Sequence, residues 1–122
     1  MANRIVHFEL PSENPERSKK FYENVLDWQF QKWDGPDEYW LIKTGDSERG
    51  IDGGLMKKNE LFQGVTNIVD TDNVAELARK ITENGGTMVA PKTPVPGIGW
   101  LIYFKDLDGH LVGAMQSDPE AK

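Results

Sequence analysis

The start of the chain alternates between apolar and polar residues, a pattern typical of a half-buried β-strand. Over residues 5–10, one face carries Ile5, His7 and Glu9, and the other face is entirely apolar. Pro11 follows directly and is expected to end the strand, because proline cannot donate a backbone hydrogen bond to a neighbouring strand. The alternation therefore predicts a strand that presents a histidine and a carboxylate on one face.

The next segment changes to a helical spacing of apolar residues. Asn14-Pro15 is typical of a helix N-cap followed by proline in the first turn, and it predicts a helix over residues 15–26. In the stretch 28–56, the turn-forming runs Asp34-Gly35-Pro36 and Gly45-Asp46 separate short apolar runs, which predicts three antiparallel strands. The first half thus has the order β-α-β-β-β.

The second half repeats this order. Residues 65–69 predict a strand, Asp72 or Asn73 caps a helix, and Gly85-Gly86 supplies its left-handed stop. Residues 91–99 contain three prolines and two glycines and are expected to form a shaped loop. The remaining strands are predicted at residues 87–89, 100–104 and 111–116.

Short similar runs in the two halves indicate an internal repeat. Trp40-Leu41-Ile42 recurs as Trp100-Leu101-Ile102 at an offset of 60, and Gly54-Leu55-Met56 recurs as Gly113-Ala114-Met115 at an offset of 59. Because 122 residues is close to two such lengths, we interpret the chain as a duplicated unit. Module one covers about residues 1–60, and module two covers about residues 61–122.

The repeat leads to a prediction of the fold. A β-α-β-β-β unit has a helix on one face of its sheet and leaves the other face open. Two such twisted sheets can pair and enclose a concave trough, which is a natural place for a small molecule. We therefore predict an α+β fold in which two tandem β-α-β-β-β modules form one domain over residues 1–122, with a mixed or antiparallel sheet trough.

Composition excludes several classes of function. The chain has 20 acidic and 14 basic residues, so its net charge of -6 disfavours nucleic acid and anionic membranes as partners. The absence of cysteine excludes disulfides, thiolate catalysis and sulfur-ligated metal. The first ten residues contain Arg4, His7 and Glu9 where a signal peptide would be apolar, and no segment approaches the length of a membrane span. We therefore expect a cytoplasmic protein.

The order of several motifs resembles the vicinal oxygen chelate superfamily, which includes glyoxalase I, bleomycin resistance proteins and extradiol dioxygenases. The landmarks lie between Val6 and Gln116: His7-Phe8-Glu9-Leu10-Pro11, Glu16-Arg17-Ser18-Lys19-Lys20-Phe21-Tyr22, Gly85-Gly86, Gly97-Ile98-Gly99-Trp100 and Phe104-Lys105-Asp106-Leu107-Asp108-Gly109-His110. The resemblance implies paired β-α-β-β-β modules, often with a divalent metal in the trough. It does not name a reaction, because this scaffold hosts isomerases, lyases, transferases, dioxygenases and binding proteins.

The resemblance also implies where metal ligands would lie, namely histidine or glutamine on the first strand and glutamate on the last strand of each module. His7 occupies the first of these positions. Its counterpart Thr66 is a poor ligand for a transition metal, and Gly54 and Gly113 at the last-strand positions have no side chain to offer. Three of the four ligands are therefore missing, and we predict no metal ion and no cofactor.

Two alternative metal sites compete with this prediction. One is a divalent metal held by a displaced cluster of His7, Glu9 and Asp52. The other is a role for His110 as a ligand, but this histidine follows Asp108-Gly109 and is better interpreted as a turn residue. Without metal partners, His7 is expected to be a trough-facing side chain that contacts a neighbour or a ligand.

The repeat supplies further candidates for contact with a ligand. Trp40 and Trp100 would form a symmetric pair for stacking on a flat or cationic ligand if they face the trough, although an aromatic residue in such a strand is more often core. Gly54 and Gly113 mark either close approach of a ligand or a strand kink. The candidate ligand-binding residues are His7, Glu9, Trp40, Asp52, Gly54, Thr66, Trp100 and Gly113.

These observations lead to three hypotheses of function. The first is a small-molecule-binding protein similar to glyoxalases and bleomycin resistance proteins, which lacks the usual metal and holds a small organic ligand in the trough. The alternative is a metal-dependent, glyoxalase-like lyase or isomerase, or an enzyme of the dioxygenase type, that uses His7 with displaced carboxylates. The third is an interaction module whose trough is filled by its own side chains. Exposed sheet edges and the resemblance both favour a homodimer.

Overall fold

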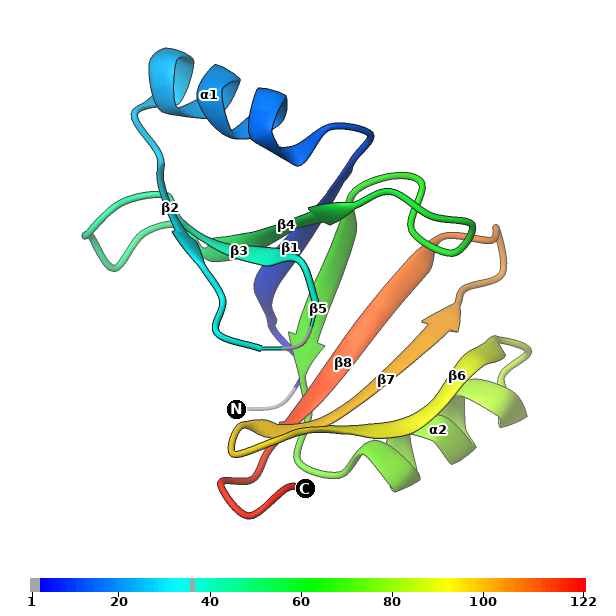
Figure 1. The fold of residues 1–122 in the computed structure, drawn as a ribbon. Helices are drawn as coiled ribbons and strands as arrows, with labels where there is room; N and C mark the ends of the chain where they lie inside the picture. The colour runs from blue at the N-terminus through cyan, green and yellow to red at the C-terminus, as the bar shows by residue number, and fades with distance from the viewer. Residues whose placement is uncertain (1–2, 36) are drawn as a thin grey trace. The chain divides into compact units, whose positions relative to one another are not determined.

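The computed structural model describes residues 3–35 and 37–122, so Pro36 of the predicted Asp34-Gly35-Pro36 turn lies outside the described residues. The order β-α-β-β-β occurs twice along the chain, as Figure 1 shows. Contacts divide the described chain into two compact units, one formed by His7–Thr66 and the other by Asn67–Lys122 together with residues 3–6. The predicted α+β fold of tandem β-α-β-β-β modules is confirmed.

Module one has a mixed four-stranded sheet in the order β2-β3-β4-β1, in which β1 is parallel to β4 and the other pairs are antiparallel. Its elements are β1 (Ile5–Ser12), α1 (Pro15–Leu26), β2 (Gln29–Lys32), β3 (Tyr39–Lys43) and β4 (Asp52–Lys57). The prediction that Pro11 ends β1 was wrong, because the strand continues to Ser12. The parallel register pairs Pro11 with Met56, and Lys58 N donates to Ser12 O at 2.8 Å, so the ladder continues past the proline.

The core of module one lies between its sheet and α1. The side chain of Asn14 accepts a hydrogen bond from Arg17 N at 3.2 Å, so α1 begins at Pro15 as predicted. On the inner face of the helix, Tyr22 stacks on Trp28 with a centroid distance of 5.0 Å. The buried cluster consists of Trp40, Ile42 and Leu55, with Phe8, Leu10, Trp28 and Phe30 packed around it.

Module two repeats this arrangement with the strand order β5-β8-β7-β6, in which β5 is parallel to β8 and the other pairs are antiparallel. Its elements are β5 (Thr66–Asp70), α2 (Val74–Glu83), β6 (Thr87–Val95), β7 (Gly99–Lys105) and β8 (Leu111–Ser117). Its buried cluster consists of Val74, Ile102 and Ala114, against which pack Val69, Leu77, Ala78, Ile81, Met88 and Trp100.

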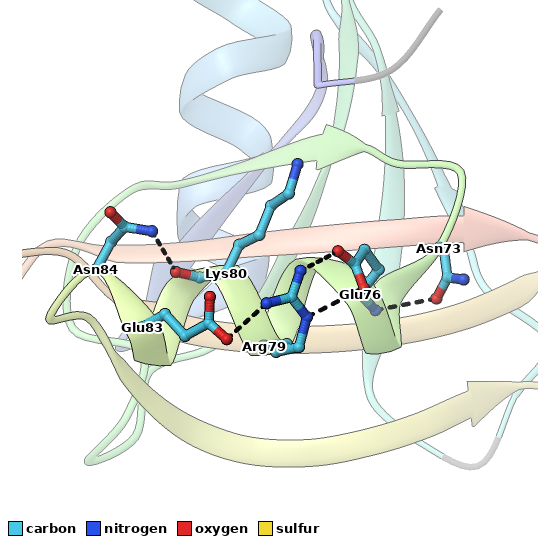
Figure 2. A network of polar contacts seen from close by, with 6 residues as sticks. All are labelled: Asn73, Glu76, Arg79, Lys80, Glu83 and Asn84. Atoms are coloured by element: carbon cyan, nitrogen blue, oxygen red, sulfur yellow. Dashed lines mark hydrogen bonds and ion pairs between the residues drawn. The ribbon is translucent and has the colours of Figure 1, made fainter.

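Polar side chains hold both ends of α2, as Figure 2 shows. Asn73 Oδ1 accepts from Glu76 N at 3.0 Å, and Asn84 donates its side-chain amide to a carbonyl of the last turn at 2.8 Å. Arg79 pairs with Glu76 and Glu83 on the exposed face, where such ion pairs add little stability. Neither helix of the described residues is long and apolar enough to cross a membrane.

Residues 91–95, which were predicted to lie in a loop, belong to β6. This strand ends the sheet order of module two and shows register shifts between Met88 and Ala90 and between Ala90 and Thr93. An edge strand tolerates Pro91 and Pro94, because one side of its backbone forms no ladder bonds and irregular register frees further N–H positions. The prediction failed because it applied the constraint on central strands to an edge strand.

Candidate functional site

Polar side chains gather on the face of module one that is turned away from α1. In the register of the sheet, Glu9 on β1 lies opposite Gly54 on β4, and His7 lies opposite Asp52. On the other side of β4, Leu41 of β3 lies opposite Gly54. Because side chains alternate along a strand and residues opposite one another share a face, these five positions lie on one surface of the sheet.

A hydrogen-bonded chain connects three of the side chains on this face. The hydroxyl of Tyr39 donates to Glu9 Oε2 at 3.1 Å and lies 2.9 Å from His7 Nε2. A tyrosine hydroxyl has one proton. When that proton is donated to an ionised Glu9, the tyrosine oxygen accepts from His7 Nε2, which then carries the ring hydrogen. The hydrogen-bonded chain therefore runs from His7 through Tyr39 to Glu9, a residue that is only 6% exposed.

The side chain of Tyr39 occupies the space that Gly54 leaves vacant. Tyr39 lies opposite Met56, two residues beyond Gly54, and its ring crosses the sheet diagonally. A Cβ atom added at Gly54 would lie 1.7 Å from the Tyr39 hydroxyl oxygen and 2.1 Å from its Cζ. The glycine thus permits a close approach, and the approaching group is a tyrosine of the same module. Trp33 contacts the Tyr39 ring edge-on with a centroid distance of 6.1 Å.

Burial determines the protonation of the His7 ring and the Tyr39 hydroxyl. Burial lowers the pKa of His7 below its ordinary value of 6.5, and the nearby Asp52 carboxylate opposes that effect only in part. Burial also raises the pKa of the Tyr39 hydroxyl, and the charge and hydrogen bond of Glu9 raise it further. At neutral pH, His7 and Tyr39 are therefore both uncharged, and His7 has one protonated and one unprotonated ring nitrogen.

Nδ1, the second ring nitrogen of His7, remains available for a hydrogen bond with a ligand. Within residues 3–35 and 37–122, no group forms a hydrogen bond with Nδ1, and no fully buried side-chain nitrogen or oxygen lacks a partner. Nδ1 therefore reaches the surface. Asp52 also remains exposed, and its Oδ1 accepts hydrogen bonds from Thr44 N at 2.9 Å and from Thr44 Oγ1 at 3.2 Å.

The two candidate tryptophans lie on the opposite faces of their sheets. Trp40 is 6% exposed and belongs to the core beneath α1. Trp100 packs against the buried cluster of module two, and its Nε1 donates to Asp118 Oδ2 at 3.0 Å. The interpretation of Trp40 and Trp100 as a stacking pair for a ligand is therefore corrected, because both face the helix of their own module. Side-chain alternation alone could not decide which face each helix covers.

The module-two candidates have other surroundings than their module-one counterparts. Thr66 is 1% exposed. A Cβ atom added at Gly113 would lie 2.8 Å from Ile68 Cδ1 and 2.9 Å from Tyr103 Cε1, so an aliphatic and an aromatic side chain fill the space over this glycine. The two glycines are equivalent in the repeat, but different side chains occupy the space over each of them.

A groove of module two has none of the predicted site residues in its lining. It has a volume of about 460 Å³ and runs between α2 and the edge strand β6. Its lining residues are Val74, Ala75, Ala78, Met88, Val89, Ala90, Pro91, Lys92 and Ile102. Among the described residues of this lining Lys92 is the only charged one, and its ammonium lies 4.5 Å from the centroid of the Trp100 ring.

The residues on the face of module one do not fit a metal ion as they stand. His7 Nε2 is directed at Tyr39, and Gly54 contributes no ligand. The potential ligand atoms of His7, Glu9 and Asp52 do not gather within 4.8 Å of one another, so the displaced cluster is not assembled among these described residues.

Asp106, Asp108 and His110 do gather within that distance, but all three are exposed. Asp106 Oδ1 accepts hydrogen bonds from the backbone N–H groups of Asp108 and His110, each at 2.9 Å, and Asp106 Oδ2 lies 3.0 Å from His110 Nδ1. These bonds fold a tight turn before β8, which accounts for the positions of all three side chains.

Tyr39 is the residue of this site that the sequence reasoning missed. Its position on the strand face shared with Leu41 was evident from alternation, as was the missing side chain at Gly54. A large residue placed diagonally from a glycine on a neighbouring strand is a signal for such a contact. The signal could not be used without the strand register, which sequence alone did not supply.

Comparison with known proteins adds the family. A family model described as the Glyoxalase/Bleomycin resistance protein/Dioxygenase superfamily matches residues 4–113. A search of curated proteins finds no significant match.

Solved structures with the same fold include three close in size. A methylmalonyl-CoA epimerase from Streptomyces coelicolor, in complex with 2-nitronate-propionyl-CoA, is 15% identical, with a TM-score of 0.69 and coverage of 100% of this chain and 99% of that one. A hypothetical protein from Bacillus halodurans C-125 is 16% identical, with a TM-score of 0.71 and coverage of 98% of both chains. A glyoxalase/bleomycin resistance protein/dioxygenase superfamily member from Vibrio splendidus 12B01 is 19% identical, with a TM-score of 0.67 and coverage of 95% and 99%. At these identities the likeness shows the fold alone.

Proposed function

Because this chain belongs to the Glyoxalase/Bleomycin resistance protein/Dioxygenase superfamily, we propose that it binds a small organic molecule without the help of a metal ion. The site lies on the face of module one turned away from α1. The observation that carries the proposal is the chain from His7 through Tyr39 to Glu9, built over Gly54. These groups form a small number of fixed polar contacts of the kind that orient a ligand.

The internal hydrogen bonds support binding that does not depend on metal. His7 Nε2 carries a hydrogen that points at Tyr39 and so has no lone pair for a metal. His7 Nδ1 keeps its lone pair, but the ligand atoms of His7, Glu9 and Asp52 do not gather within 4.8 Å of one another. A carboxylate side chain at position 54 would have to displace the Tyr39 ring, since even a Cβ atom there lies within 3 Å of it. Tyr39 thus occupies the space that a metal-binding side chain on β4, the last strand of the module, would need.

The alternative hypothesis of a metal-dependent lyase or isomerase has a direct test. The protein is purified without chelator, its metal content is measured, and Ni²⁺, Zn²⁺ and Fe²⁺ are then titrated into it. We expect substoichiometric metal and no saturable binding at His7. His110→Gln is the matched control, because it removes the other histidine from an exposed turn. Stoichiometric metal that is lost in His7→Gln and retained in His110→Gln would overturn the proposal.

Ligand binding itself is tested by thermal shift with a library of small amines, acids, alcohols and amides. A molecule that binds only the folded protein raises the apparent stability, by about 2.7 kcal/mol at one hundred times its Kd. We expect at least one class of compound to raise the Tm of the wild type and of His110→Gln but not of His7→Gln. No shift with any class would favour the interaction module instead.

The homodimer and the cytoplasmic location stay predictions.

A further inference from the structure

We propose that His7 Nδ1 is held as a hydrogen-bond acceptor and, with the Asp52 carboxylate beside it, selects an organic cation that carries N–H donors. The inference rests on the proposed small-molecule site and names the chemical class of its ligand. Tyr39 and Glu9 act as positioning residues, because they determine which ring nitrogen of His7 faces the ligand.

The first step concerns the tautomer of His7. The buried Glu9 carboxylate can only accept, so it orients the Tyr39 hydroxyl proton toward itself at 3.1 Å. The tyrosine oxygen can then accept only, and it receives the Nε2 hydrogen of His7 at 2.9 Å. A neutral imidazole with its hydrogen on Nε2 presents a lone pair at Nδ1. One buried carboxylate therefore decides, through a tyrosine, what His7 offers.

The second step concerns where this lone pair points. Within the described part of the chain, Nδ1 has no hydrogen-bond partner and is not among fully buried atoms. An acceptor held at a surface in this way binds a donor, whereas it would repel the oxygen atoms of a carboxylate or phosphate. A ligand with an N–H or O–H group fits the nitrogen, and an anion does not.

The third step concerns charge on the same face. Asp52 lies opposite His7 in the register and is close enough to influence its protonation electrostatically. Glu9 lies on the other side of His7 along β1. Lys43 lies on β3, the strand next to β4, and its ammonium pairs with Asp46 at 2.7 Å, which reduces its repulsion of a second cation. The surroundings of Nδ1 in module one thus favour a donor that is positively charged.

The tautomer is tested by NMR of the two ring systems in ¹⁵N-labelled protein at pH 7.5. The chain has only two histidines, so His110 is an internal control. We expect His7 as the single Nε2–H tautomer in the wild type. In Tyr39→Phe the hydroxyl is gone, and His7 should change to a mixture of tautomers while His110 keeps its signals. A wild-type His7 that is mainly the Nδ1–H tautomer overturns the inference.

A second variant keeps the test decisive if Tyr39→Phe fails to fold. Glu9→Gln replaces the acceptor-only carboxylate by an amide that can also donate to the Tyr39 oxygen. The hydrogen-bond chain can then run in either direction, so we expect the Nδ1–H form of His7 to become measurable. A purely structural role for Glu9 would leave the tautomer unchanged, and that result would contradict the assignment of a positioning residue.

Ligand class is tested with two probes that share one ring, benzylammonium and benzoate. We expect millimolar benzylammonium to shift the ring signals of His7 but not those of His110, and benzoate to shift neither. Asp52→Asn is the informative variant, because its oxygen can still accept from Thr44 while its charge is lost. We expect benzylammonium to bind it about tenfold more weakly, because the attraction between the two opposite charges is lost.

The outcomes separate the two levels of the proposal. If benzoate shifts His7 as strongly as benzylammonium does, or if Asp52→Asn binds benzylammonium unchanged, the ligand class is wrong while the binding site stands. If benzylammonium produces no shift but the library contains another His7-dependent ligand, the ligand class again fails alone. If no compound depends on His7, the site and the inference built on it both fail.

Discussion

The substitution Gly54→Ala tests the arrangement of the module-one site most directly. A methyl group at this position would lie 1.7 Å from the Tyr39 hydroxyl oxygen and 2.1 Å from Cζ, far inside van der Waals contact. The backbone of β4 is held between β3 and β1, so the Tyr39 ring is the part that must move. Its movement breaks the hydrogen bonds to His7 and Glu9 together.

The expected loss of stability follows from those two bonds. A hydrogen bond to a buried carboxylate contributes about 1.5–3 kcal/mol, and a neutral one contributes about 1 kcal/mol. Both bonds are lost, so we expect Gly54→Ala to lower the free energy of unfolding by about 2–4 kcal/mol. For a chain of this size each kcal/mol corresponds to a Tm shift of about 3–6 °C. The Tm should therefore fall by about 6–24 °C.

The assay is urea unfolding followed by tryptophan fluorescence, with Gly45→Ala as the matched control. Gly45 has no described atom within 4 Å of its added Cβ, so the same substitution there should change stability by less than about 0.5 kcal/mol. A double-mutant cycle with Tyr39→Ala isolates the clash, because Gly54→Ala should cost little once the ring is absent. Equal effects of the two glycine substitutions, or no coupling between positions 54 and 39, would refute the reasoning.

Three further predictions concern stability. The pKa of His7 is lowered in the folded state, so the unfolded chain binds a proton first and the free energy of unfolding should fall as pH drops below about 6.5. The urea midpoints at pH 5 and pH 8 should therefore differ less in His7→Gln than in the wild type. An equal difference in the two proteins would contradict this cause. Leu55→Ala should cost about 2–5 kcal/mol because Leu55 is 0% exposed, whereas Leu107→Ala, at a residue 76% exposed, should cost almost nothing in the same unfolding assay. Asn73→Ala should cost about 1 kcal/mol by removing the cap of α2, whereas Asn73→Asp should retain most of it, as thermal unfolding can measure.

Local features of the sequence predicted most of the elements. Asn14 and Asn73 cap their helices through contacts that span three residues, so no distant part of the chain is needed to recognise them. The repeated Trp-Leu-Ile strands lie at corresponding places in the two modules. The errors at Pro11 and at residues 91–95 share one cause, since proline is tolerated or excluded according to which neighbours a strand has.

The candidate site was predicted only in part. Alternation placed His7 and Glu9 on one strand face, and the repeat singled out Gly54, all of which the structure brings together. Alternation could not decide whether Trp40 faces the helix or the opposite side, and the structure places it in the core. Tyr39 was not recognised, because its contact with Gly54 depends on a diagonal between two strands.

The sequence by itself determined the two β-α-β-β-β modules, the caps of their helices and the loss of side chains at the last-strand positions, since these are properties of local spacing and residue type. Only the tertiary structure decided what fills the space over Gly54. Strand register brings Tyr39 across that glycine, and burial beside Glu9 then orders the protons of the chain that ends at His7. Register and burial are set by packing among segments distant in sequence, so no local pattern of residues could contain them.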